Sequence, residues 1–367
     1  MKRHLWFTGP IGVFLMALVV MMLSSNTGNA SCGSVTCFVV VGSQQQVSPE
    51  GLWTVNLFYN YTPQRKILSG TTGVIPGIDV QGRTMTLNDH QEQSTITQML
   101  TLDLNYGITD RLGIEIAIPY KSLVHHHIDA LGVDNGGAGT PERFSDSGIG
   151  DIFINGKYNW LPTLRSMVVT GIGVYLPTGE NQSADPHGGV FEPTAQLGRG
   201  QFGLQGSLYQ TYELIPMRLN QFSSASYRHT FKNNWGYQFG DQYDLSAGFN
   251  LVVVPWFVLS TQFNYRYMVH DTFSSTLERA PQPGEPEFGV SDVVIDPTVK
   301  TRRVPTTGST YNAVTPGFTL GVGEFVKWEW AKMTKVYAFA QIPVARDFNG
   351  NLAQGTSYMV GVTQYFR

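Results

Sequence analysis

The chain has 367 residues, with 24 lysines and arginines against 27 aspartates and glutamates, and a net charge of -3. This balance offers no basic surface, so we exclude a nucleic-acid partner. The length exceeds that of a small disulfide-stabilised scaffold, and 40 glycines with 12% aromatic residues favour an all-β chain. A mean hydropathy of -0.10 is compatible with a membrane barrel, because only every second side chain of each strand faces lipid.

Residues 1–30 have the layout of a secretory signal peptide. Lys2 and Arg3 give a positive start, an apolar run from Ile11 to Leu23 follows, and Ala30 ends a small-residue cleavage site. The apolar run is shorter than the roughly 20 residues that a membrane helix needs. We therefore expect export, with cleavage after Ala30.

Two cysteines follow directly, in the stretch Cys32-Gly-Ser-Val-Thr-Cys37. Because an exported protein meets an oxidising compartment, we predict a Cys32–Cys37 disulfide in a short periplasmic segment, residues 31–50. A metal or haem site is the weaker interpretation, since two thiols alone do not complete a zinc site. A lipid anchor on Cys32 also stays open, although Asn29 stands where a lipobox carries a leucine-like residue.

Beyond this segment, apolar and polar residues alternate in long runs, which is typical of strands with one apolar face. The alternation is clear where Leu112, Ile114 and Ile116 are separated by Gly113 and Glu115. Runs of this length suit membrane-barrel strands of about 9–11 residues better than soluble strands of about five or six. The predicted strands lie at 51–61, 93–106, 111–121, 147–159, 166–177, 200–213, 221–231, 236–251, 256–270, 309–326, 335–345 and 355–367.

The connections between the predicted strands alternate in length. The short ones include 107–110, 161–163, 253–255 and 329–331. The long ones include 62–92, 122–146, 178–199 and the proline-rich 271–308. Short turns at one end and long loops at the other are typical of outer-membrane barrels. We therefore predict one all-β domain, residues 51–367, folded as a transmembrane antiparallel up-and-down β-barrel of about 12 strands.

Aromatic residues at strand ends and turns fit the two rings of amphipathic side chains at the membrane surfaces, although aromatic residues also favour strands in general. These residues are Tyr59, Tyr61, Tyr106, Tyr120, Tyr158, Trp160, Trp256, Tyr265, Tyr267, Trp328 and Trp330. The ending Tyr365-Phe366-Arg367 resembles the signal that barrel-assembly machinery recognises, although Arg367 departs from the usual terminal aromatic. Expected partners are therefore this machinery, membrane lipid and lipopolysaccharide.

Three motifs resemble elements of one known family. The stretch Leu104–Pro119 contains Tyr-Gly-Ile-Thr-Asp-Arg-Leu and resembles that family's hairpin, and Ser147–Ile152 and Gly173–Gly179 resemble its "G-x-G-D" and "[LF]-P-T-G" elements. The family comprises outer-membrane transporters assigned to the meta-pathway of phenol degradation. The resemblance implies a barrel that admits aromatic or other hydrophobic compounds. The resemblance assigns no functional residue to this chain. We interpret the glycines of the motifs as turn or bend residues.

If the apolar faces of the strands meet lipid, the alternate faces line the lumen. Lumen-lining candidates are Asp103, Glu115, Asp151, Asn155, Lys157, Asp244, Asn264, Arg266, Phe58, Met99, Tyr209 and Met268. An arginine or lysine on the lipid face at the midplane would cost about 2–4 kcal/mol, which supports the inward assignment. The inward charges either select a solute or pair with one another and fill the lumen, and both interpretations stay open.

Candidate catalytic and metal-binding residues are sparse. His125–His127 falls in a predicted extracellular loop, where consecutive side chains of an extended chain point to opposite sides and chelate one ion poorly. His229 near Ser223, Ser224 and Ser226 comes closest to a hydrolase constellation, and no motif supports it. We predict no enzyme, no metal and no cofactor.

The predicted function is an outer-membrane channel that passes small solutes, aromatic or hydrophobic compounds among them, by passive diffusion. The alternative is a structural or adhesive barrel with a blocked lumen, whose extracellular loops bind a ligand. A third hypothesis, a hydrolase at the barrel rim, would need His229 to contact a serine.

Overall fold

The computed structural model describes residues 45–68, 79–80, 83–84, 91–129, 140–163, 165–183, 193–234, 237–273, 307–349 and 351–366. Several predictions fall outside these residues: the signal peptide at 1–30, the Cys32–Cys37 disulfide, Arg367, and most of the segment 31–50 and of the connection 271–308. They stay predictions. No helix within the described residues is long and apolar enough to cross a membrane.

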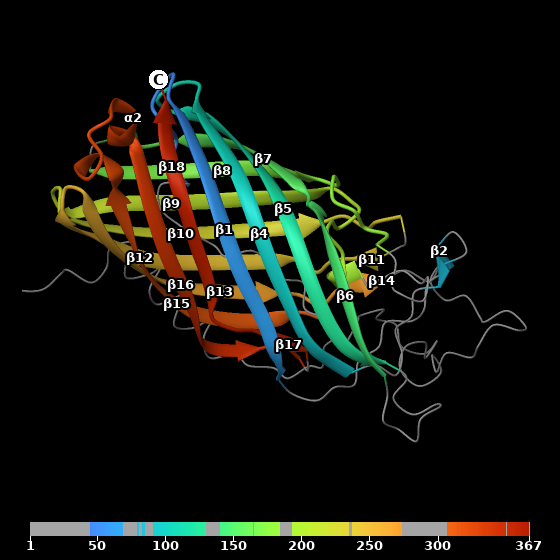
Figure 1. The fold of residues 1–367 in the computed structure, drawn as a ribbon. Helices are drawn as coiled ribbons and strands as arrows, with labels where there is room; N and C mark the ends of the chain where they lie inside the picture. The colour runs from blue at the N-terminus through green and yellow to red at the C-terminus, as the bar shows by residue number, and fades with distance from the viewer. Residues whose placement is uncertain are drawn as a thin grey trace, which may run out of the picture.

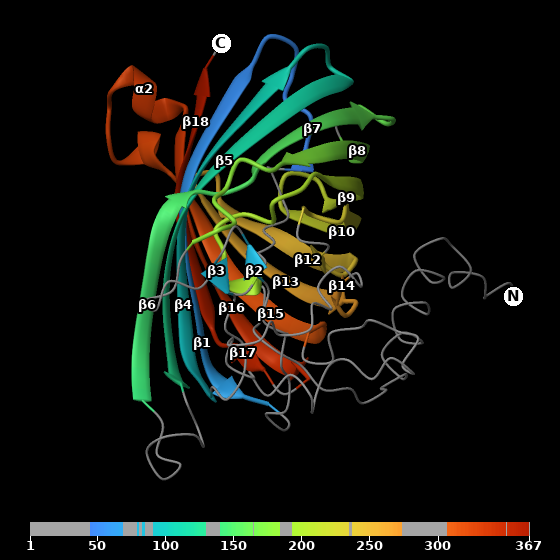
Figure 2. The same ribbon diagram turned by 90° about the vertical axis from the view of Figure 1, so that its right-hand side faces the viewer.

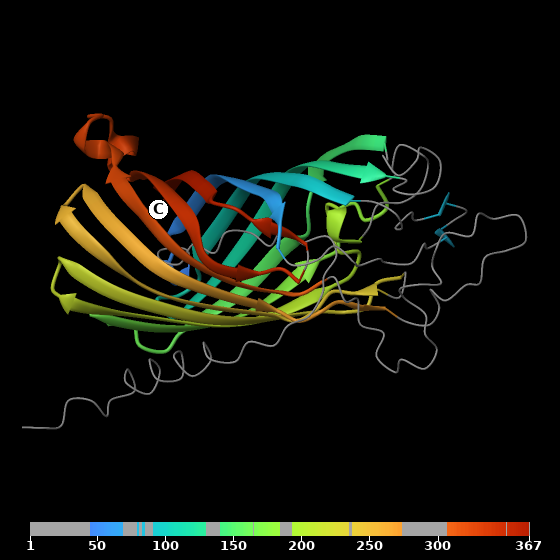
Figure 3. The same cartoon turned by 90° about the horizontal axis from the view of Figure 1, so that it is seen from below.

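In the described part of the chain, 12 long strands form a closed antiparallel barrel (Figures 1 and 3). They are β1 (Trp53–Ile67), β4 (Gln91–Gly107), β5 (Leu112–Asp129), β7 (Ile152–Asn159), β8 (Ser166–Leu176), β9 (Gly203–Ile215), β10 (Leu219–Thr230), β12 (Gln242–Val254), β13 (Phe257–Met268), β15 (Ser309–Gly321), β16 (Thr334–Asp347) and β18 (Ser357–Phe366). Each pairs with its neighbours along the chain, and β1 closes the ring by pairing with both β4 and β18. The predicted up-and-down barrel is confirmed.

The remaining elements lie outside this ring of 12 strands. They are β2 (Asp79–Val80), β3 (Arg83–Thr84), β6 (Thr140–Ile149), β11 (Tyr237–Gln238), β14 (Thr272–Phe273), β17 (Leu352–Gln354), the 3₁₀ turns η2 (Pro193–Ala195) and η5 (Val322–Glu324), and the helix α2 (Glu329–Lys332). The strand predicted at 147–159 is divided between β6 and β7, with Gly150 and Asp151 between them. Strand β6 stays paired with β5 and lies apart from β8, as Figure 2 shows.

Several predicted boundaries are wrong; the strand predicted at 236–251, for example, is divided between β11 and β12. His125–His127 lies inside β5 and not in a loop, because β6 supplies hydrogen-bonding partners that extend β5 to Asp129. The connection predicted at 329–331 spans 322–333, because β15 ends at Gly321 and the chain then forms η5 and α2. The other short connections join the strands at the same end, which we call the short-turn end; the opposite one is the long-loop end.

The alternation of side chains gives the barrel an apolar outer face and a chiefly polar inner face. Large apolar residues are exposed on the outside, among them Leu57, Leu100, Leu208, Phe249 and Leu259. Rings gather near both ends of the outer face: Trp53 lies 4.6 Å from Tyr106 at the short-turn end, and Tyr227, Tyr243 and Tyr267 follow one another near the long-loop end. An apolar belt between rings of aromatic residues is what a lipid bilayer requires of a barrel.

Candidate functional site

The lumen is the candidate site, and the residues predicted to line it are placed there by strand alternation. Met99, Asp103, Glu115, Asp151, Asn155, Lys157, Tyr209, Asp244, Asn264, Arg266 and Met268 are buried, and Phe58 is half-buried against Tyr337 and Met359. Their burial, together with the alternation of side chains along each strand, places these residues on the inner face. Their role in selecting a solute stays a prediction.

One group of these residues forms a polar network near the short-turn end, which we call the short-turn network. Lys157 Nζ lies 2.8 Å from Glu115 Oε2 and donates a 2.8 Å hydrogen bond to Asn105 Oδ1. Asn105 donates to one oxygen of Asp103 at 2.9 Å, and Asn56 donates to the other at 2.8 Å. The network joins β1, β4, β5 and β7, so every charge in it has a partner on an adjacent strand.

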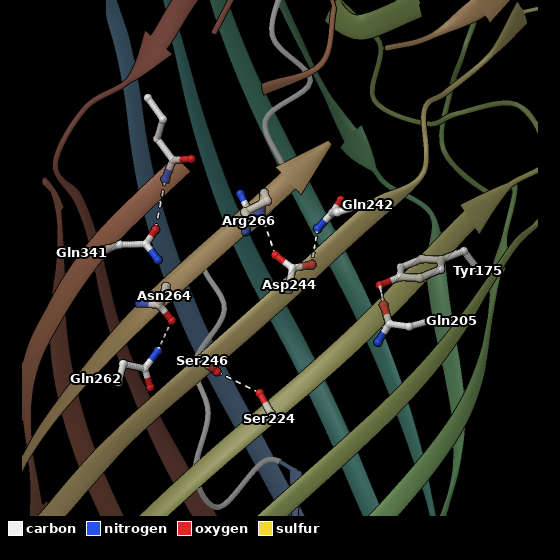
Figure 4. A network of polar contacts seen from close by, with 11 residues as sticks. Tyr175, Gln205, Ser224, Gln242, Asp244, Ser246, Gln262, Asn264, Arg266 and Gln341 are labelled. Atoms are coloured by element: carbon white, nitrogen blue, oxygen red, sulfur yellow. Dashed lines mark hydrogen bonds and ion pairs between the residues drawn. The ribbon is translucent and has the colours of Figure 1, made fainter. Parts of the chain in front are cut away.

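A second polar network follows the opposite wall toward the long-loop end (Figure 4). Arg266 Nε donates to Asp244 Oδ1 at 2.9 Å, and Gln242 donates to the other carboxylate oxygen at 2.6 Å. Gln262 donates to Asn264 at 2.6 Å. Arg266 and Asp244 are directly opposite each other on β13 and β12, so this ion pair also lies within the wall and does not cross the lumen.

The segment 45–50 enters the barrel at the short-turn end. Val47 packs in an apolar cluster with inner-face residues of β8, β9 and β10, namely Val169, Tyr209 and Phe222. The carbonyl oxygens of Ser48 and Pro49 lie over Gly107, where a Cβ would come within 2.1 Å of Pro49 O. Gly107 is therefore required by this close approach. Nothing in the sequence pattern marks this packing.

The connection between β8 and β9 also folds against the inner face. Ala195 packs with Leu123 of β5 and Phe144 of β6. Lys121 Nζ donates to the carbonyl oxygen of Leu197 at 2.6 Å. Asp151, predicted to line the lumen, accepts the backbone N–H of Arg199 at 2.9 Å and so holds this connection in place.

Arg199 and Asp271 form a buried charged cluster at the long-loop end. The Arg199 guanidinium donates to Thr230 at 2.8 Å and lies 4.7 Å from the centre of the Phe239 ring. Burial lowers the pKa of Arg199 to about 9, with a further lowering from nearby Arg228. Burial likewise raises the pKa of Asp271 to about 6, although the carboxylate accepts hydrogen bonds from Tyr237 and from the Gly240 N–H.

A third inner-wall feature combines aromatic rings with a cation. Phe153 of β7 and Tyr175 of β8 stack with ring centres 4.4 Å apart, and the Arg228 guanidinium of β10 lies 3.6 Å from the centre of the Tyr175 ring. We call these three residues the aromatic–arginine site. The sequence analysis missed it, although the alternation through Phe222 and Thr230 would have placed Arg228 on the inner face.

His125 and His127 of β5 each lie close to a glutamate. His125 Nε2 lies 3.1 Å from Glu92 Oε2, and His127 Nε2 lies 3.6 Å from Glu142 Oε2. The two rings are 5.2 Å apart on the same face. Among the residues that the structure describes, no group of three or more histidine, cysteine, aspartate or glutamate side chains is arranged to hold a metal ion.

The residues predicted as hydrolase candidates bond to other side chains and not to one another. His229 Nδ1 lies 2.7 Å from Asp241 Oδ1. Ser223 accepts a hydrogen bond from Gln210 on the outer face, whereas Ser224 bonds to Ser246 within the lumen. No contact between His229 and any of these serines is present in the described residues, so the geometry of a nucleophile with its base is not formed there.

The closed barrel, its apolar belt and its polar lumen define the class of membrane-spanning β-barrels. A family model described as "Putative MetA-pathway of phenol degradation" matches residues 101–280. The resemblance that the three motifs carry is therefore confirmed, because all three lie within the matched segment. No curated relative matches the chain in sequence.

Solved structures share this architecture. An outer membrane channel from Pseudomonas putida F1 has 11% identity and a TM-score of 0.54, and the match covers 89% of this chain and 100% of that one. The toluene transporter TbuX of Ralstonia pickettii has 10% identity and a TM-score of 0.42, over 93% of this chain and 96% of its own. The likeness to the Pseudomonas putida channel, at 11% identity, concerns the fold.

Proposed function

We propose that this chain is an outer-membrane channel through which small aromatic or otherwise hydrophobic solutes diffuse passively. The observation that carries the proposal is the arrangement of the inward charges. Glu115 pairs with Lys157 and Asp244 pairs with Arg266, each across one pair of neighbouring strands, and neither pair bridges the lumen. Because both of these pairs run along the wall, neither forms an ionic bridge across the centre of the barrel.

The solute class is supported by the family and by the lining of the lumen. Phenol degradation requires entry of small rings that carry a polar group. The lumen presents amides and hydroxyls, such as Gln242, Asn264 and Ser246, beside rings such as Tyr175 and Phe153. The ring of such a solute can stack on the aromatic side chains while its polar group bonds to the amides and hydroxyls.

The test is transport by the purified barrel. We expect discrete conductance steps in planar bilayers and faster uptake of labelled phenol by lipopolysaccharide-covered vesicles that contain the protein. Val47→Ser should raise the conductance, because a hydroxyl weakens the packing of segment 45–50 on Tyr209 and Phe222. The matched control is Val253→Ser on the exposed outer face.

The second candidate function is a barrel with a blocked lumen, whose extracellular loops bind a ligand. It is favoured by the inward position of segment 45–50 and of the β8–β9 connection. Its signature is the absence of conductance and of phenol uptake both in the unmodified chain and in Val47→Ser. Loss of the block in Val47→Ser alone would indicate a channel closed by this segment.

A further inference from the structure

Arg228 is an inward cation without a neutralising partner. Its guanidinium makes no ion pair and no hydrogen bond within the residues that the structure describes, and its Nε is buried without an acceptor. The guanidinium lies over the Tyr175 ring, 3.6 Å from the ring centre. Another inward arginine of the barrel wall, Arg266, donates instead to Asp244 at 2.9 Å. A buried donor without an acceptor costs free energy, so an occupant that supplies an acceptor is favoured.

The stacked rings of Phe153 and Tyr175 form a flat surface next to Arg228, which we call the shelf. Phe153 and Tyr175 stack at an interplanar angle of 28°. Tyr175 also donates from its hydroxyl to Gln205 Oε1 at 2.9 Å, which fixes the orientation of its ring (Figure 4). Gly173 leaves room for this shelf, because a Cβ there would come within 2.3 Å of the Phe153 ring. Phe153, Tyr175 and Arg228 are only half-buried, so a solute in the lumen can reach them.

The surrounding charges leave Arg228 uncompensated. Arg199 is close enough to Arg228 for their like charges to repel. The acids that interact with Arg199 are Asp151 and Asp271, and each already accepts backbone N–H groups. Asp241 faces His229 and Tyr227 on the outer side of the same strand. Among the residues that the structure describes, Arg228 therefore has no carboxylate in contact with its guanidinium.

We propose that Phe153, Tyr175 and Arg228 form a binding site for an aromatic carboxylate inside the lumen. The proposal rests on the proposed channel function for the route by which the ligand arrives. The ring of the ligand stacks against the shelf, and its carboxylate accepts N–H groups from the Arg228 guanidinium. A planar guanidinium presents donors in a fork that matches the two oxygens of a carboxylate, which a lysine ammonium does not.

The ring and the carboxylate of the ligand each interact with a different part of the site. A neutral aromatic alcohol has the ring but no carboxylate to pair with the Arg228 guanidinium. An aliphatic carboxylate neutralises the charge but gains less from the stacked rings. The site is therefore expected to prefer benzoate over benzyl alcohol and over cyclohexanecarboxylate, which have similar sizes.

The experiment is isothermal titration calorimetry of the detergent-solubilised, full-length barrel with these three compounds as probes. We expect saturable benzoate binding, with benzyl alcohol and cyclohexanecarboxylate each weaker by about tenfold or more. Arg228→Gln should weaken benzoate binding by about tenfold, and Arg228→Lys should restore only part of it because the fork is lost. Tyr175→Leu should narrow the preference for benzoate over cyclohexanecarboxylate.

The matched control is the double variant Asp244→Asn, Arg266→Gln, which removes an inward arginine together with its partner and should keep full benzoate affinity. Heat-modifiable migration on gels establishes that each variant is folded. Equal affinities for benzoate and benzyl alcohol, or unchanged binding in Arg228→Gln, would overturn the site. Conductance without any benzoate binding overturns the site and keeps the channel, whereas binding without conductance supports the site and overturns the channel.

Discussion

Lys157 and Arg228 occupy comparable positions and have opposite surroundings. Both extend from barrel strands toward the lumen. Lys157 is 2% exposed and contacts Glu115 and Asn105 at 2.8 Å each. Arg228 is half-buried, lies on the Tyr175 ring and stands near a second cation, Arg199.

This difference separates charges that hold the wall together from charges that are available to a solute. Removing one partner of a buried ion pair leaves the other charge without compensation, so the paired lysine belongs to the stability of the barrel. The arginine has no such partner among the described residues, so removing it uncovers no carboxylate. Stability and binding should therefore respond to the two cations in opposite ways.

The largest expected effect is at Lys157. Lys157→Met leaves the Glu115 carboxylate buried without its cation and should lower the free energy of unfolding by about 3–5 kcal/mol. Urea titration in lipid vesicles, followed by tryptophan fluorescence, measures it. The double variant with Glu115→Gln should recover most of the loss. Equal losses in the single and double variants would contradict the pairing and point to packing.

Asp271 should produce the next largest effect, as a pH dependence. Its pKa in the folded chain is about 6, above the ordinary 3.8, because burial disfavours the carboxylate. The folded chain therefore binds a proton that the unfolded chain has released, so the free energy of unfolding rises as pH falls from about 6 and is fully gained below 3.8. The difference between the two pKa values corresponds to roughly 3 kcal/mol.

The measurement is the free energy of unfolding against pH for the unmodified chain and for Asp271→Asn. Between pH 3.8 and 6, the free energy of unfolding should change less steeply with pH in the variant, because an asparagine at this position binds no proton. Identical slopes would show that Asp271 titrates in the folded barrel as it does in water.

Lys157 and Arg228 also show which features of the lumen can be predicted from the sequence. Alternation alone placed Asp103, Glu115 and Lys157 on the inner face, because a strand has a side-chain period of two. It could not tell which residues pair, since the partners lie on different strands and depend on register. The pairing of Glu115 with Asn155 and the extension of β5 by β6 are such register effects.

Residues outside the strands were not predictable by the same pattern. Arg199 and Asp271 stand in connections, where no periodicity assigns a face. Their burial comes from contacts with Phe239, Thr230 and Tyr237 that join separate connections of the long-loop end. The inward packing of Val47 likewise depends on three strands far along the chain.

A smaller effect is expected where the aromatic–arginine site needs space. Gly173→Ala would bring a Cβ within 2.3 Å of the Phe153 ring, so the ring must move. Overpacking of this kind costs about 1–3 kcal/mol of stability. Calorimetry should also show weaker benzoate binding, because the shelf is displaced. Gly206→Ala is the matched control, since open space surrounds that position; a similar loss of benzoate affinity there would refute a local cause.

The smallest effect on stability should come from Arg228 itself. Arg228→Met removes a cation–π contact, worth about 0.5–1 kcal/mol in exposed settings, and also removes repulsion with Arg199. The two contributions oppose each other, so urea titration should give a change within about 1 kcal/mol, while benzoate binding is lost. A loss comparable to that of Lys157→Met would place Arg228 among the residues that stabilise the wall. A change in the free energy of unfolding within about 1 kcal/mol, together with weaker benzoate binding, would instead show that Arg228 serves the ligand. The folded barrel would then gain no stability from this cation, and the carboxylate of the ligand would supply its counter-charge.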